Sequence, residues 1–181
     1  MKRYLVERTT RALARRNGAD ASYVMALYDA SPAALRGIGK VSAMLRHREA
    51  IPVEAALAAQ LVGALQEGCG SCVQIHINMA RQAKVADGLI AAILCDDHDE
   101  LPPDAALAAW FASAIGRRST DEAEAREAVR ARWGEKGVID LTMATQVSRF
   151  LTMLKAGFGY ASTCTSLSVG ERTVLPKRRS A

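Results

Sequence analysis

The sequence predicts an all-α fold in a single domain of 181 residues. Alanine and leucine dominate a chain that is 50% hydrophobic, and aromatic residues make up only 5% of it. The long β-branched runs that favour strands are missing. Apolar residues instead recur at helical spacing between short breakers. We therefore expect helices along most of the chain and no sheet.

Turn residues separate the first three expected helices. An amphipathic stretch over residues 3–16 ends at an Asn-Gly pair, and a shorter one covers residues 20–29. The Ser-Pro pair at 31–32 is typical of an N-cap followed by a first helical residue. A third helix is therefore expected over residues 32–46.

Prolines and glycines delimit the helices in the middle of the chain. A proline opens the alanine-rich helix over residues 52–67, and glycines separate it from the next helix, over residues 70–83. The helix over residues 86–95 ends in an acidic loop. Two prolines precede the helix over residues 104–115, and a glycine follows it.

Two helices and a tail complete the expected chain. Ser119 or Thr120 can cap a helix whose first turn is acidic, as the helix dipole favours. A mostly apolar helix follows from about residue 136 to residue 158, and we expect it in the centre of the core. Residues 165–181 have no helical pattern and are expected to form a loose tail.

The net charge is +5 and the positive charge lies at the two ends of the chain, with +5 on residues 1–16, +3 on residues 171–181 and −3 on the residues between them. Nucleic-acid binding would need these charges on one folded face beside base-reading side chains. A membrane span would need about 18–20 consecutive apolar residues. Neither pattern is present, so we expect no nucleic acid and no membrane as partner. The basic start lacks the pattern of a signal peptide, and a cytoplasmic location is expected.

The strongest chemical signal is the stretch EGCGSCVQIH at residues 67–76. Glycines on both sides of Cys69 predict a tight turn that places Cys69 and Cys72 at the N-terminus of the next helix. Unpaired N–H groups and the helix dipole stabilise a thiolate there. His76 lies four residues after Cys72 on the same helix face and can accept its proton. We therefore expect a reactive dithiol in which Cys72 has the lower pKa.

The motif is also compatible with other kinds of site. A structural zinc site needs four ligands, and the motif supplies three, with Cys95 or His98 as candidates for the fourth. An inert pair of buried cysteines is also compatible with the pattern. A thioredoxin-like site is excluded, because an alanine-rich helix is expected where that fold has a strand. We expect no metal and no cofactor.

An all-helical chain with CxxCxxxH at a helix–turn–helix junction resembles the AhpD-like alkylhydroperoxidases of the carboxymuconolactone decarboxylase superfamily. The stretches NMARQAKVADGLIAAIL and GVIDLTMATQVSRFLTMLKAGFG extend the resemblance over about residues 30–160. It implies an AhpD-like helical bundle, as a single domain over residues 31–160. An N-terminal helical segment over residues 1–30 precedes it, and a C-terminal tail over residues 161–181 follows.

The resemblance implies a thiol oxidoreductase that reduces hydroperoxides. Cys72 would attack the hydroperoxide and become a sulfenic acid, and Cys69 would resolve it as a disulfide. Cys95 and Cys164 would stay outside this disulfide. The expected partners are a small hydroperoxide, an external thiol reductant and identical subunits in a trimer or hexamer. The alternatives are a non-catalytic helical oligomer of the same superfamily and a zinc-stabilised helical module.

Two positions depart from the family pattern. Family members commonly carry a glutamate twelve residues before the first cysteine, as part of a proton relay to the histidine, and Leu57 occupies that position here. Glu54 lies one turn earlier and Glu67 lies next to the turn, and we include Glu54 with the two cysteines and the histidine as a candidate catalytic residue. Some members have a histidine just before the second cysteine, where this chain has Ser71.

Overall fold

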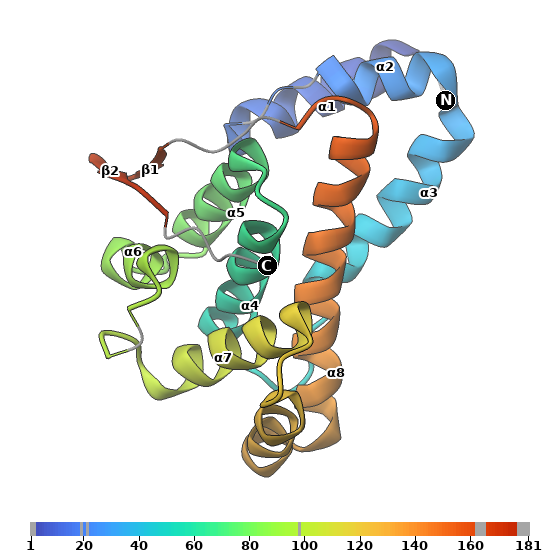
Figure 1. Ribbon diagram of the computed structural model, residues 1–181. Helices are drawn as coiled ribbons and strands as arrows, with labels where there is room; N and C mark the ends of the chain where they lie inside the picture. Colours follow the sequence, from blue (N-terminus) through green and yellow to red (C-terminus); the bar gives the residue numbers. More distant parts are fainter. Residues whose placement is uncertain (1–2, 19, 21, 98, 162–165, 177–181) are drawn as a thin grey trace.

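Helices make up most of the structure, as predicted. The computed structural model describes residues 3–18, 20, 22–97, 99–161 and 166–176. In chain order its elements are α1 (Arg3–Asn17), α2 (Ser22–Ala30), α3 (Pro32–Ala43), the 3₁₀ turn η1 (Met44–Arg46), α4 (Val53–Gln66), α5 (Gly70–Gln82), α6 (Asp87–Cys95), α7 (Pro103–Arg117), α8 (Glu122–Gly157), β1 (Leu167–Val169) and β2 (Arg172–Val174) (Figure 1). Within the described part of the chain, none of the helices combines the length and the apolar character that a membrane span requires.

The core is built from α4, α7 and α8, which pack against one another. Every residue from Ala55 to Ala64 of α4 is buried, which explains why this helix is apolar on all sides. A Cβ atom on Gly63 would lie 2.6 Å from the backbone oxygen of Thr145, so the absence of a side chain there lets α4 and α8 approach closely.

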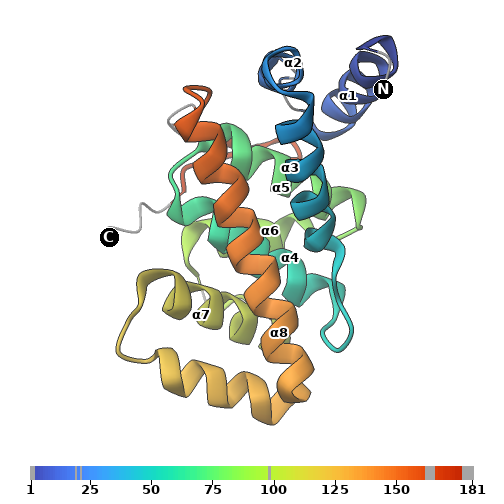
Figure 2. The same cartoon turned by 90° about the vertical axis from the view of Figure 1, so that its right-hand side faces the viewer.

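The long element α8 consists of two helical segments. Gly134 separates them with φ 69° and ψ −169°, a conformation that glycine adopts without steric cost. The first segment consequently runs in a different direction from the second (Figure 2). The sequence predicted two helices here, and the break between them is confirmed.

The first three helices form an arm beside the core (Figure 2). None of the residues of α2 and α3 is fully buried, whereas α1 buries Val6 and Ala14. The arm touches the rest of the fold where α1 meets α5 and where α3 meets α8. It therefore reaches the two helices that carry the candidate site.

A buried carboxylate fixes the loop between η1 and α4. Asp140 of α8 is fully buried, and its Oδ2 accepts hydrogen bonds from the backbone N–H groups of Glu49, Ala50 and Ile51 at 2.9, 2.8 and 3.3 Å. His47 Nε2 lies 3.4 Å from Oδ1 of the same side chain. These contacts hold the start of α4 against α8.

The prediction of a loose C-terminal tail without a sheet is wrong. Leu167–Val169 pairs with Arg172–Val174 in an antiparallel hairpin that contacts α5 and α6. The side chain of Gln74 donates to the carbonyl of Ser168 at 2.8 Å and accepts from its N–H at 2.9 Å. Strands of three residues are too short to show a clear alternating pattern in the sequence.

Candidate redox site

The two motif cysteines lie at the start of α5, as predicted. Gly68 has φ 66°, the left-handed conformation that turns the chain out of α4. Cys69 is the N-cap residue, and its carbonyl accepts hydrogen bonds from the backbone N–H groups of Cys72 and Val73. Both cysteines are therefore close to the positive end of the α5 dipole.

Their sulfur atoms are neighbours. The Sγ atoms of Cys69 and Cys72 are 2.6 Å apart, and the two side chains are only 1% and 7% exposed. Cys95 is exposed on α6, and Cys164 lies outside the described residues. Of the described cysteines, Cys69 and Cys72 are thus the pair that can exchange between dithiol and disulfide.

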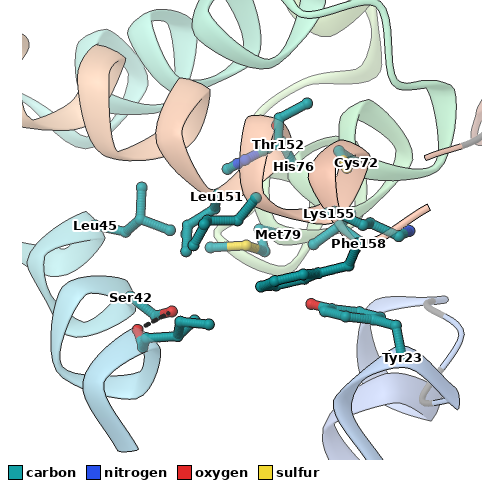
Figure 3. Close-up of a pocket in the computed structure, with 13 residues that line it drawn as sticks. Tyr23, Ser42, Leu45, Cys72, His76, Met79, Leu151, Thr152, Lys155 and Phe158 are labelled. Carbon is teal, nitrogen blue, oxygen red and sulfur yellow. Dashed lines mark hydrogen bonds between the residues drawn. The ribbon is translucent and has the colours of Figure 1, made fainter. Parts of the chain in front are cut away.

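Cys72 faces a pocket of about 140 Å³ between the arm and helices α5 and α8 (Figure 3). Most of the side chains around it are apolar, among them Leu45, Met79 and Phe158. Cavities of roughly 150 Å³ hold molecules as large as benzene. Cys69 is not among the lining residues, so a small apolar molecule in this pocket would meet Cys72 rather than Cys69.

His76 lines the same pocket and is 5% exposed. Ser148 Oγ donates to the carbonyl of Gln60 at 2.8 Å and lies 2.9 Å from His76 Nε2. Because the serine has one hydrogen to give, His76 donates from Nε2, and Nδ1 is the unprotonated nitrogen. Among the described residues, Nδ1 has no hydrogen-bond partner. Burial lowers the pKa of His76 to about 4, so the ring is neutral at neutral pH.

The expectation that Cys72 has the lower pKa is corrected by these contacts. The pKa of the Cys72 thiol is raised above its ordinary range, first by its hydrogen bond to Cys69, then by burial and by the negative charge of Cys69. The charge of Lys155 and a contact with Thr152 oppose this effect only in part. A neutral His76 that is bonded to Ser148 cannot hold a Cys72 thiolate as an ion pair.

The structure does not bring Glu54 into the site. Its side chain is exposed in the first turn of α4, six residues or about 9 Å of helix from Gln60, which receives the Ser148 hydrogen bond. Leu57 is buried in the core, and Glu67 forms an ion pair with Arg149 at 2.7 Å. Ser148, whose hydroxyl donates to a backbone carbonyl, therefore contacts the histidine where the family pattern has a carboxylate.

Three polar residues of α8 complete the site and were not predicted. Ser148, Thr152 and Lys155 are buried on one face of the helix. Lys155 Nζ donates to Ser71 Oγ at 2.7 Å and lies 5.3 Å from the centre of the Tyr23 ring (Figure 3). Polar residues at helical spacing inside an otherwise apolar helix were the available signal.

The described residues contain no group of three or more metal-ligating side chains that could hold a metal ion, and His98 lies outside them. The sequence matches no protein-family profile and no curated protein, and the fold matches no solved structure. The candidate function therefore depends on the geometry of the two thiols and the pocket.

Proposed function

We propose that the protein is a cytoplasmic thiol oxidoreductase with an AhpD-like bundle, which reduces small hydroperoxides through a Cys69–Cys72 dithiol/disulfide cycle. The observation that carries the proposal is the position of Cys72, which lines a mostly apolar pocket and whose sulfur lies 2.6 Å from the sulfur of Cys69. A small organic hydroperoxide has the apolar body that such a pocket favours and a polar O–O group for the thiol.

The oxidative half of the cycle begins at Cys72. Its sulfur forms a bond to the terminal oxygen of the hydroperoxide while the O–O bond breaks, which gives a sulfenic acid and an alkoxide. The thiol proton finally resides on the alkoxide, which leaves as an alcohol. Nδ1 of His76 can carry this proton because it is an unprotonated nitrogen in the same pocket.

The remaining steps regenerate the dithiol. The Cys69 sulfur attacks the Cys72 sulfur and expels hydroxide, which takes up a proton and leaves as water. An external dithiol then returns two electrons and two protons by thiol–disulfide exchange. Each turnover therefore converts one hydroperoxide and two reducing thiols into an alcohol, water and a disulfide.

A count of reactive thiols tests the proposal. The reduced protein should lose about two thiols after one equivalent of tert-butyl hydroperoxide, and dithiothreitol should restore them. The Cys95→Ser variant is the matched control, because it removes an exposed thiol outside the site and should lose the same two. A native protein whose thiol count does not change would instead be the non-catalytic helical oligomer.

We also propose that identical subunits assemble into a trimer or hexamer. Ile139, Phe150 and Met153 of α8 lie on one face of that helix and are 50%, 39% and 47% exposed. Such apolar surface is typical of subunit interfaces. Sedimentation at micromolar concentration measures the mass directly, and a stable monomer would contradict the assembly.

A further inference from the structure

We propose that Lys155, acting through the hydroxyl of Ser71, holds Cys69 as the thiolate of the reduced pair. Lys155 is thus a positioning residue, since it reaches the sulfur through another side chain. The inference rests on the proposed function only for the part that this thiolate plays in turnover. The contacts that support the Cys69 thiolate are present in the reduced protein before any substrate binds.

Lys155 donates a hydrogen bond to Ser71, and Ser71 can in turn donate one to the sulfur of Cys69. An ammonium group can only donate, so Ser71 Oγ accepts the 2.7 Å hydrogen bond from Lys155 Nζ. The hydroxyl keeps its own hydrogen for another acceptor, and Cys69 Sγ lies 3.4 Å from it. The chain of donors therefore ends on the sulfur of Cys69.

The second cysteine adds a donor to the same sulfur. With Cys69 as thiolate, the 2.6 Å contact is a hydrogen bond in which Cys72 donates its S–H, in agreement with the raised pKa of Cys72. Thr152 contacts Cys72, but its hydroxyl already donates to the carbonyl of Ser148 at 3.0 Å. Cys69 thus has the donors of Ser71 and Cys72 directed at it, whereas the Thr152 hydroxyl that contacts Cys72 already donates elsewhere.

Charge balance favours the same assignment. Lys155 is 6% exposed, and none of the carboxylates that the structure describes lies within ion-pair distance of its ammonium group. A buried cation is costly unless a nearby anion offsets it. A thiolate on Cys69, itself 1% exposed, supplies that anion one hydroxyl away.

None of the other titratable groups that the structure describes around the pair supplies this anion. Asp20 carries a carboxylate whose charge acts on the lysine, but its side chain is exposed. The pKa of Tyr23 is raised, mainly by burial and then by the charges of the two cysteines, so its phenol stays neutral. Glu67 is paired with Arg149, and His76 is neutral.

The thiolate has a defined part in the proposed cycle. It is the nucleophile that attacks the Cys72 sulfenic acid, and it is the leaving group when the disulfide is reduced. In that reduction the external thiolate bonds to Cys72, which lines the pocket, and the electron pair of the S–S bond passes to Cys69. Lys155 and Ser71 then stabilise the sulfur that leaves.

The ultraviolet absorbance of thiolates, followed against pH in the reduced protein, tests the inference. A variant without Cys69 and Cys72 supplies the background. Lys155→Met should raise the pH midpoint of thiolate formation by about 1–2 units, and Ser71→Ala by about one unit. Lys155→Arg should restore most of the shift. Lys136→Met is the matched control, because Lys136 is also on α8 but is 69% exposed, and it should leave the midpoint unchanged.

The equilibrium with glutathione gives a second readout. Loss of a stabilised thiolate makes the disulfide harder to reduce, so Lys155→Met should shift the equilibrium about tenfold toward the disulfide, or about 30 mV. Ser71→Ala should shift it in the same direction. If Lys155→Met does not fold, as judged by circular dichroism, Ser71→Ala decides the result alone.

Two results would overturn the inference. One is an unchanged titration midpoint in both Lys155→Met and Ser71→Ala. The other is a Cys69→Ser variant that still forms a thiolate at the native midpoint, because the anion would then be on Cys72. Hydroperoxide reduction is tested separately. If the protein does not react with hydroperoxide but Lys155→Met still raises the pH midpoint of thiolate formation, the proposed function is refuted and the assignment of the Cys69 thiolate stands.

Discussion

Acid should weaken the fold through His76, which is buried and uncharged. An unperturbed histidine has a pKa of about 6.5, whereas burial lowers that of His76 to about 4. Above about pH 6.5 the ring is neutral in both the folded and the unfolded chain, so it adds no pH dependence there. Between about pH 6.5 and pH 4 only the unfolded chain binds the proton, and stability falls as the pH falls.

The size of the effect follows from the shift. One pKa unit corresponds to about 1.4 kcal/mol, so a shift of about 2.5 units amounts to about 3 kcal/mol once the pH is below both values. At about pH 5, where most of the unfolded chain is protonated and the folded chain is not, the loss is about 2 kcal/mol. That is a large part of the 5–15 kcal/mol or so that stabilises a typical domain.

Urea unfolding at about pH 7 and about pH 5, followed by circular dichroism, measures this loss. His76→Gln removes the ionisation and keeps an N–H donor for Ser148. The native protein should lose about 2 kcal/mol more than the variant between the two pH values, and the contributions of all other groups cancel in that comparison. Equal losses in the two proteins would refute the assignment of a buried, neutral His76.

Substitutions at other positions have distinct expected effects. Cys72→Ser should abolish the loss of thiols to hydroperoxide, whereas Cys69→Ser should trap a sulfenic acid that dimedone labelling and mass spectrometry detect. Asp140→Ala leaves three backbone N–H groups without their acceptor and should cost about 3 kcal/mol or more in urea unfolding. Gly63→Ala should cost about 1–3 kcal/mol by separating α4 from α8. Gly88→Ala, where an added Cβ meets nothing within 4 Å, is its control and should not destabilise.

The helices could be predicted because their signals are local. The Ser31 hydroxyl accepts the hydrogen bond of Ala34 N–H, and Pro32 begins α3, as the sequence indicates. The end of α3 differs, since Met44–Arg46 forms a 3₁₀ turn rather than a continuation of the helix. The hairpin was missed because its stability comes from burial against α5 and α6, and the pairing of two three-residue strands leaves little trace in the sequence.

The candidate site was predictable only where it lies on one stretch of chain. Cys69, Cys72 and His76 share one helix and its N-cap, so their spacing placed them together. Their polar partners come from α8, and the contacts that join them span 72 residues for Ser148 and 84 for Lys155. Spacing on one helix also cannot reveal burial, which makes His76 neutral, or the contact with Cys69 that together with burial raises the pKa of Cys72.

The redox state of the pair decides whether the buried cation has an anion beside it. In the dithiol form, the thiolate of Cys69 offsets Lys155 through Ser71. In the disulfide form that charge is absent, and among the described residues the lysine keeps the Ser71 hydroxyl and the face of Tyr23 as close partners. An uncompensated buried charge raises the free energy of the oxidised state relative to the reduced one. The same contacts that stabilise the thiolate therefore favour reduction of the disulfide, and with it the dithiol state in which the proposed cycle begins.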